Sequence, residues 1–189
     1  MDNARGTFGR WMVVGRISAV VALAAALVPG AAYAGHQPPA AATPHLENTA
    51  PSIDVLIGRF LGALTAKDRK ALQRLRVNER EYIDIIMPGS IEPGKERRTF
   101  PEDKAQYFWG VLNEKSVYSE TALLNGYGGR KYKVQTFTWA KGVKQFDGYT
   151  GYGQLRLIVK DAKGDSHEIQ TGSVAEIGGR YKFISYVRD

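Results

Sequence analysis

The feature that most constrains the fold of this chain is a change in hydrophobic periodicity between Leu124 and Arg130. Before it, apolar residues recur at the spacing of one helix face, and after it they alternate with polar residues. Four alternating segments follow, joined by short turns such as Gly178-Gly179; they span residues 130–139, 153–161, 167–177 and 180–189. This order predicts an α+β domain whose N-terminal helices pack on a curved, antiparallel, four-stranded sheet.

The first expected helix covers residues 53–64, where the apolar residues form one continuous stripe. Ser52 precedes it and is a preferred N-cap residue. The turn 65–68 (TAKD) leads into a second, short helix with either Thr65 or Asp68 as its N-cap. The residues that this second helix is expected to bury are Ala71, Leu72 and Leu75.

Two more helices are expected before the strands. The third begins at Asn78 and ends at 87–89 (MPG), because proline and glycine terminate helices. The fourth is long: Thr99 and Glu102 have the spacing of a capping box, and 125–126 (NG) is a typical C-terminal stop. The residues expected on its buried face are Ala105, Phe108, Trp109 and Leu112.

The first 34 residues have the composition of a secretory signal peptide. A leader with several arginines precedes the apolar stretch 17–28, and 32–34 (AYA) is a small-x-small cleavage site. The apolar stretch is short for a membrane span, so we expect cleavage, no stable membrane span afterwards, and a periplasmic or secreted location. The predicted organisation is a signal peptide at 1–34, a flexible Pro/Ala-rich tether at 35–51 and one domain at 52–189.

The charge pattern argues against nucleic acid as a partner. The chain has 26 Lys and Arg against 19 Asp and Glu, a net charge of +7, but only 95–98 (KERR) is a dense basic cluster. There is no cysteine, which excludes thiol chemistry and a lipid-modified N-terminal cysteine. His36 and His45 lie in the tether, and no metal-ligand spacing or nucleophile-elbow motif is present. We therefore expect neither a metal nor a cofactor.

The stretch 59–75, RFLGALTAKDRKALQRL, resembles the first helix pair of the nuclear transport factor 2-like (NTF2-like) superfamily, which includes ketosteroid isomerase and SnoaL-type proteins. The family pattern is an apolar helix, a small turn and an ALxxL helix, matched here by 65–68 and 71–75. The later helix and the strand meander fit the same plan, so the resemblance covers most of 52–188. It implies a cone-shaped α+β fold, which hosts enzymes, binding proteins and dimerisation modules.

The resemblance also implies where isomerase chemistry would lie. The tyrosine that donates to the developing oxyanion in ketosteroid isomerase corresponds to Phe60, which has no hydroxyl. The general base corresponds to Met87, before Pro88, and methionine cannot accept a proton; Asp84 is a weak substitute. The dehydratase branch needs Asp and His pairs, whereas the expected domain contains only His167. We therefore expect no catalytic residues of these kinds.

The densest cluster of polar and aromatic residues is 145–154, QFDGYTGYGQ. Asp147 could act there as an acceptor or base, with Tyr149 and Tyr152 as donors. The glycines are equally typical of a turn and a bend at the entry to a strand, and we favour that interpretation. The candidate ligand-binding residues are this trio and three further aromatic residues, namely Phe60, Trp109, Trp139, Asp147, Tyr149 and Tyr152.

The sequence therefore favours an exported NTF2-like domain that binds, without catalysis, a small apolar or amphipathic ligand or a protein partner in the cell envelope. The alternative is an enzyme of the isomerase, dehydratase or hydrolase type that uses Asp147 with Tyr149 or Tyr152. A third interpretation is a homodimer that buries the open face of the sheet.

Overall fold

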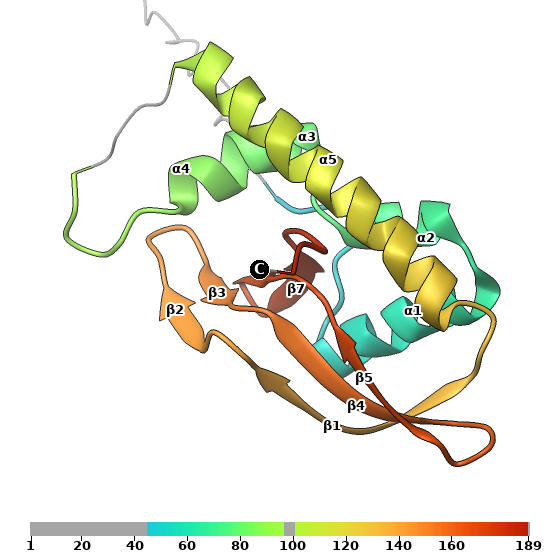
Figure 1. Cartoon of the computed structure of the whole chain (residues 1–189). Helices are drawn as coiled ribbons and strands as arrows, with labels where there is room; N and C mark the ends of the chain where they lie inside the picture. Colours follow the sequence, from blue (N-terminus) through green and yellow to red (C-terminus); the bar gives the residue numbers. More distant parts are fainter. Residues whose placement is uncertain (1–44, 97–100, 189) are drawn as a thin grey trace, which may run out of the picture. The chain divides into compact units, whose positions relative to one another are not determined.

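The computed structural model describes residues 45–96 and 101–188. The signal peptide, residues 35–44 of the tether and the Thr99 cap that the sequence predicts lie outside the described residues. The described part is an α+β domain of helices and two antiparallel sheets (Figure 1). The predicted α+β class is confirmed, whereas the strands are divided between two sheets instead of forming one sheet of four strands.

The predicted helix pair consists of α1 (Ile53–Ala66) and α2 (Arg69–Leu75). The Ser52 hydroxyl accepts a hydrogen bond from the Val55 N–H at 3.2 Å, which confirms this N-cap. The Asp68 carboxylate accepts one from the Ala71 N–H at 2.9 Å, so Asp68 is the N-cap of the second helix. Thr65 instead donates its hydroxyl to backbone carbonyls. Both helix starts follow from side chains that can satisfy otherwise unpaired N–H groups.

A short helical region follows α2. It consists of α3 (Glu79–Glu81), the π-helix η1 (Tyr82–Ile86) and α4 (Met87–Gly89). The Asn78 side chain accepts from the Glu81 N–H at 2.9 Å, while the Glu81 carboxylate accepts from the Asn78 N–H at 2.8 Å. This capping box confirms the predicted start at Asn78. The π-helical turn was not predicted, because the apolar spacing there does not distinguish it from an α-helix.

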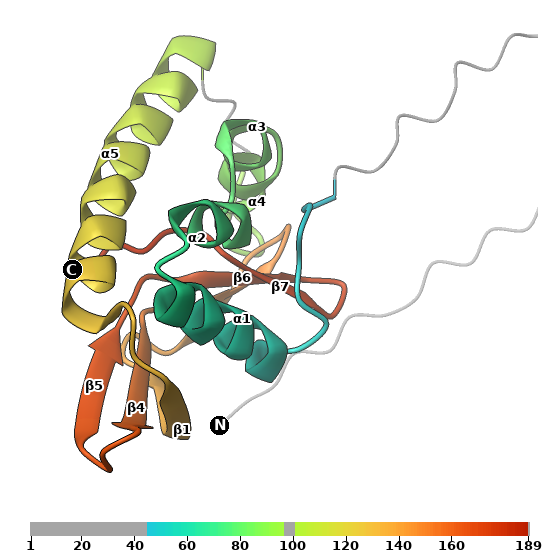
Figure 2. The same cartoon turned by 90° about the vertical axis from the view of Figure 1, so that its right-hand side faces the viewer.

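Helix α5 (Glu102–Tyr127) is the longest element and contacts α1, α2 and η1 (Figures 1 and 2). It passes the predicted stop at 125–126 and ends at Gly128, whose N–H donates to the Leu124 carbonyl at 2.9 Å. A Cβ at Gly128 would lie 2.3 Å from that carbonyl oxygen, so this position requires glycine.

The buried face of α5 differs from the predicted one. Ala105 is buried as expected, and Trp109 and Leu112 are half-buried, but Phe108 is 44% exposed. The prediction for Phe108 was wrong because it assigned only apolar residues to the interior. The helix instead buries two polar residues in its C-terminal half, and its buried residues are Ala105, Ser116, Glu120 and Leu123.

The strands form two antiparallel sheets. In spatial order, the first contains β1 (Tyr132–Trp139), β4 (Leu155–Asp161) and β5 (Ser166–Gln170). The second contains β2 (Val143–Gln145), β3 (Thr150–Tyr152), β6 (Val174–Ile177) and β7 (Arg180–Phe183). The sequence did not predict β2 and β3, because each has three residues and they flank a glycine-rich turn.

The predicted strand 167–177 is divided into β5 and β6 by a break at 171–173. Gly172 packs closely there, since a Cβ on this residue would lie 2.2 Å from the Ser185 carbonyl oxygen. Backbone hydrogen bonds continue through the break, from the Leu155 N–H to the Gly172 carbonyl and from the Thr171 N–H to the Leu155 carbonyl. These bonds hold the break, which connects β5 of the first sheet to β6 of the second, against the start of β4.

The main hydrophobic core joins α1 and α2 to strands of both sheets. Phe60 is fully buried at its centre, with its ring 5.4 Å from that of Phe183 and 5.8 Å from that of Tyr186. Buried and more exposed side chains alternate along β4, as expected for a strand with one covered face, whereas β6 and β7 each bury two consecutive residues. The buried strand residues of the main core are Leu155, Leu157, Val159, Ile169, Val174 and Phe183.

Residues 45–51, which the sequence assigns to the tether, contact the domain. Leu46 is buried, and Ala50 is fully buried with its N–H and carbonyl both bonded to Tyr181 of β7 at 2.9 Å. The segment therefore pairs with the edge of the second sheet and adds apolar surface to the core.

Candidate functional site

The C-terminal half of α5 faces the interior with polar side chains. Ser116 and Glu120 are both fully buried and stand one helical turn apart on the same face. Arg76, directly after the last residue of α2, is 5% exposed and lies opposite Glu120. A buried arginine and glutamate are rare unless they are paired, so this pair is the first candidate for a functional site.

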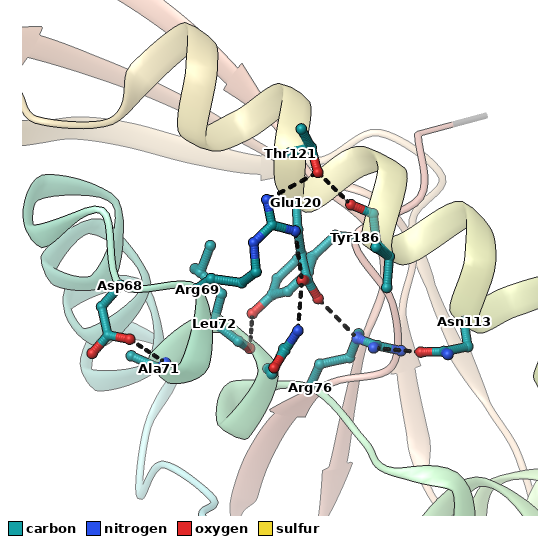
Figure 3. Close-up of polar contacts among 11 residues, drawn as sticks. Asp68, Arg69, Ala71, Leu72, Arg76, Asn113, Glu120, Thr121 and Tyr186 are labelled. Atoms are coloured by element: carbon teal, nitrogen blue, oxygen red, sulfur yellow. Dashed lines mark hydrogen bonds and ion pairs between the residues drawn. The ribbon is translucent and has the colours of Figure 1, made fainter.

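The Arg76–Glu120 pair has few good hydrogen bonds (Figure 3). The Arg76 Nε lies 3.4 Å from the Glu120 Oε1, and the Arg76 Nη2 donates to the Asn113 Oδ1 at 2.8 Å. On the other side of the carboxylate, the Gln73 Nε2 is 3.5 Å from the Glu120 Oε2 and the Arg69 Nη1 is 4.0 Å from it. The three contacts to the Glu120 carboxylate are longer than the 2.7–2.9 Å typical of charge-assisted hydrogen bonds.

Several buried polar atoms have no hydrogen-bond partner among the described residues, and most of them belong to this pair or to Ser116, one helical turn from Glu120. Although the Arg76 Nε and the Glu120 Oε1 attract each other at 3.4 Å, their geometry is not that of a hydrogen bond. A buried unpaired polar group costs about 1–3 kcal/mol, and native proteins usually satisfy such groups with ordered water or a ligand. The unpaired atoms are Arg76 Nε, Arg76 Nη1, Ser116 Oγ, Glu120 Oε1 and Thr171 Oγ1.

Desolvation shifts the protonation equilibria of both charged partners. Burial lowers the pKa of Arg76 from its ordinary value, although the attraction of Glu120 opposes the shift. Burial also raises the pKa of Glu120, and here the attraction of Arg76 opposes the shift. In each case the loss of hydration outweighs the partner's charge. Ionisable groups perturbed in this way are concentrated at functional sites.

Tyr186 closes the cluster on the side of the main core. It is fully buried, and its hydroxyl donates to the Leu72 carbonyl at 2.7 Å. Burial and the nearby Glu120 carboxylate raise its pKa well above the ordinary value. Tyr186 is therefore neutral, and because its hydroxyl hydrogen is bonded to the Leu72 carbonyl, it does not donate to Glu120.

A second buried ion pair provides a contrast. The Lys182 Nζ lies 2.8 Å from both carboxylate oxygens of Glu81 and donates to the Glu47 carbonyl at 2.7 Å. The Glu81 carboxylate also accepts the N–H groups of Glu47 at 2.6 Å and Asn78 at 2.8 Å. All three ammonium hydrogens therefore have acceptors. The Lys182–Glu81 pair fastens the N-terminal segment to β7 and α3, whereas the Arg76–Glu120 pair keeps unused bonding capacity.

A groove of about 290 Å³ lies between η1, α5 and the C-terminal segment. Its lining combines apolar and hydroxyl side chains with one cation, and the residues are Tyr82, Phe108, Val111, Leu112, Lys115, Ser173, Ser185 and Val187. Two of these residues are close in sequence to residues with unpaired groups: Lys115 precedes Ser116, and Ser173 is two residues from Thr171. We refer to it below as the α5 groove.

A stack of side chains connects the buried pair to the α5 groove. The Arg76 guanidinium lies over the Trp109 ring, 5.4 Å from its centroid, and the Trp109 ring lies 5.6 Å from that of Tyr82. Tyr82 lines the groove and is the first residue of the π-helix η1. π-Helical turns occur frequently at functional sites, and this one brings an aromatic ring to the groove.

The six candidate residues from the sequence are divided between the main core, which contains Phe60 and is contacted by Trp139 and Tyr152, a second hydrophobic cluster that contains Tyr149 and is contacted by Trp109, and the exposed turn at Asp147. Phe60 is in the main core, and Trp109 lies in the stack below the α5 groove. Trp139 and Tyr152 are brought together, with ring centroids 5.0 Å apart. Asp147 is exposed in the β2–β3 turn, and Tyr149 is buried in a separate cluster with its hydroxyl 2.7 Å from the Ser90 hydroxyl. Asp147, Tyr149 and Tyr152 therefore do not converge on one point.

Sequence reasoning missed the residues that form the buried pair. The spacing of Trp109, Leu112, Ser116, Glu120 and Leu123 does place all five on one helix face, and this signal was present in the sequence. Arg76 gave no comparable signal, because it follows the end of α2 and its burial depends on how α5 packs.

Comparison of the chain with protein-family models, with curated proteins and with solved structures gave no significant match. Within residues 45–96 and 101–188, every helix is too short or too polar to cross a lipid bilayer. The same ranges contain no group of three or more His, Cys, Asp or Glu side chains that could hold a metal ion.

Proposed function

We propose that this chain is an exported, noncatalytic binding domain of the NTF2-like type that takes a small amphipathic ligand in the α5 groove. The order of elements supports the NTF2-like assignment: a capped helix pair, a long helix and then antiparallel strands. The leader at 1–34, with its cleavage site at 32–34, supports export.

The observation that carries the proposal is that Arg76 and Glu120 have unpaired hydrogen-bonding atoms and that Trp109 connects Arg76 to a groove lined by both apolar and polar side chains. Ligand sites are typically apolar with a few convergent polar groups. The apolar part of a ligand would lie against Phe108, Val111 and Leu112, while its polar end would meet the buried pair. The groove volume of about 290 Å³ is near the lower end for ligand pockets, which favours a small molecule.

A noncatalytic role is proposed because the residues that would supply known chemistry are replaced or dispersed. Phe60 and Met87 lack the donor and base that the isomerase resemblance requires. Asp147 is exposed and separate from Tyr149 and Tyr152, which weakens the alternative of an enzyme that uses this trio.

Native mass spectrometry of the protein purified from its own cells tests the proposal. We expect a reproducible additional mass that is released on denaturation. The variant Leu112→Trp fills the α5 groove and should lose this mass. The matched control Val143→Trp changes an exposed residue of β2 and should keep it. A protein that carries no additional mass, or a Leu112→Trp variant that retains it, would contradict binding in this groove.

A further inference from the structure

We propose that the polar end of the ligand is an anion and that Arg76 is the residue that binds it, an inference that rests on ligand binding in the α5 groove. Three features support this assignment: the charge balance around Glu120, the free donors of Arg76 and the position of Trp109.

The charge around the pair is positive. Two guanidinium groups, those of Arg69 and Arg76, share the single carboxylate of Glu120. The other groups that act on this carboxylate are the neutral Gln73 and Tyr186. Lys115 adds a further cation at the edge of the α5 groove. A cationic ligand would be repelled here, whereas an anion would be attracted.

The free donors lie on Arg76. Its Nη2 is already bonded to Asn113, while its Nε and Nη1 have no hydrogen-bond partner. An anion can accept these N–H groups, and hydrogen bonds between ionised partners are about twice as strong as those between neutral ones. The Ser116 hydroxyl, one helical turn from Glu120, is buried, unpaired and able to donate to the same anion.

Trp109 controls access to these donors. Its ring lies against the Arg76 guanidinium and separates it from Tyr82 in the α5 groove. Because the Arg76 Nη1 is buried, a ligand head reaches it only if a covering side chain moves, and Trp109, which lies over the guanidinium, is the side chain that we expect to move. Binding of the anion should therefore change the environment of the Trp109 indole, which tryptophan emission reports.

Three eight-carbon probes that differ in the charge of their head group test the proposal: octanoate, octanol and octylamine. Isothermal titration of the purified protein should show octanoate binding about tenfold or more tightly than the other two, since one charge-assisted hydrogen bond has roughly this effect. In a Trp139→Phe background, octanoate should shift the emission of Trp109. A smaller shift with octanol is also expected, because the neutral probe does not reach Arg76.

The variant Arg76→Met/Glu120→Leu removes both buried charges together, so it leaves no unpaired charge and should fold. We expect it to bind all three probes with similar affinity. The matched control Arg156→Met/Glu168→Leu removes a half-exposed ion pair on the first sheet and should keep the preference for octanoate.

Equal binding of octanoate and octanol by the unmodified protein would overturn the anion proposal and leave ligand binding intact. A preference for octanoate that survives in Arg76→Met/Glu120→Leu would overturn the role of Arg76. If none of the three probes binds, both proposals fail, and the unpaired atoms bond only to ordered water.

Discussion

At the scale of single residues, the two buried ion pairs differ in how many of their hydrogen-bonding groups have partners in the protein. Lys182 and Glu81 satisfy each other and three backbone groups, whereas Arg76 and Glu120 leave donors and acceptors unpaired. A buried pair of charges stabilises a fold only when its geometry and hydrogen bonds offset the loss of hydration. The Arg76–Glu120 pair does not meet this condition, which is the reason for regarding it as functional.

The first prediction concerns the stability of variants of this pair. Arg76→Met should lower the free energy of unfolding by about 3 kcal/mol or more, because it leaves the Glu120 carboxylate buried without its partner. Arg76→Met/Glu120→Leu should be neutral or stabilising. Urea denaturation measures both. If the double variant were the less stable of the two, the Arg76–Glu120 pair would be a structural element.

The contrasting variant Lys182→Met/Glu81→Leu tests the same reasoning at the other pair. It should lower the free energy of unfolding by more than about 2 kcal/mol, because the N–H groups of Glu47 and Asn78 and the Glu47 carbonyl lose their partners. A double variant as stable as the unmodified protein would show that the two pairs do not differ in this way.

The second prediction is a dependence of stability on pH. The pKa of Glu120 is raised in the folded protein above its ordinary value of 4.5, so the folded state binds the proton more tightly than the unfolded state. The stabilisation from the protonated form is complete below pH 4.5 and is lost as the pH rises through the raised pKa. The charged and polar groups that face Glu120 are Arg69, Gln73, Arg76 and Tyr186.

Urea denaturation between pH 4 and pH 8 measures this effect. The unmodified protein should lose unfolding free energy as the pH rises, relative to Arg76→Met/Glu120→Leu, which lacks the Glu120 carboxyl. A difference that stays constant with pH would mean that Glu120 titrates alike in the folded and unfolded states.

At the scale of elements, the starts of α1, α2 and α3 were predictable because each of these three helices has a side chain that caps it. Ser52, Asp68 and Asn78 can be identified from the sequence, and each makes the expected bond. The break between β5 and β6 could not be predicted, because it depends on the close approach of Gly172 to Ser185 from a distant part of the chain. Likewise, β2 and β3 are too short for alternation to be recognised.

The third prediction compares two glycines. Gly172→Ala should lower the free energy of unfolding by about 1–3 kcal/mol, because the added Cβ would meet the Ser185 backbone at 2.2 Å. Gly126→Ala, inside α5 with open space around it, should instead raise it by about 0.5–1 kcal/mol. Thermal unfolding of both variants measures the effects. If Gly172→Ala were tolerated, the break would not depend on this contact.

At the scale of the whole molecule, the sequence predicted the α+β class and the order of helices and strands, because both follow from hydrophobic periodicity. It did not predict the candidate site, since the pairing of Arg76 with Glu120 arises only when α5 packs beside α2. The homodimer remains a prediction. The sheet surface proposed for it carries the Arg156–Glu168 ion pair.

The fourth prediction concerns processing of the chain. If residues 1–34 are a signal peptide cleaved after Ala34, N-terminal sequencing of the protein from a periplasmic or culture fraction should begin at Gly35. Replacement of Ala34 by a bulky residue should leave a longer chain. Recovery of the protein in the cytoplasmic fraction with residues 1–34 still attached would contradict export.

The most direct measurement of the central claim is a crystal structure of the protein grown with octanoate. We expect electron density for the alkyl chain in the α5 groove, with a carboxylate oxygen about 3 Å from the Arg76 Nη1. We also expect the Trp109 ring to be displaced from its position over the Arg76 guanidinium. An empty groove, with Arg76 and Glu120 bonded only to ordered water and Trp109 unmoved, would contradict it.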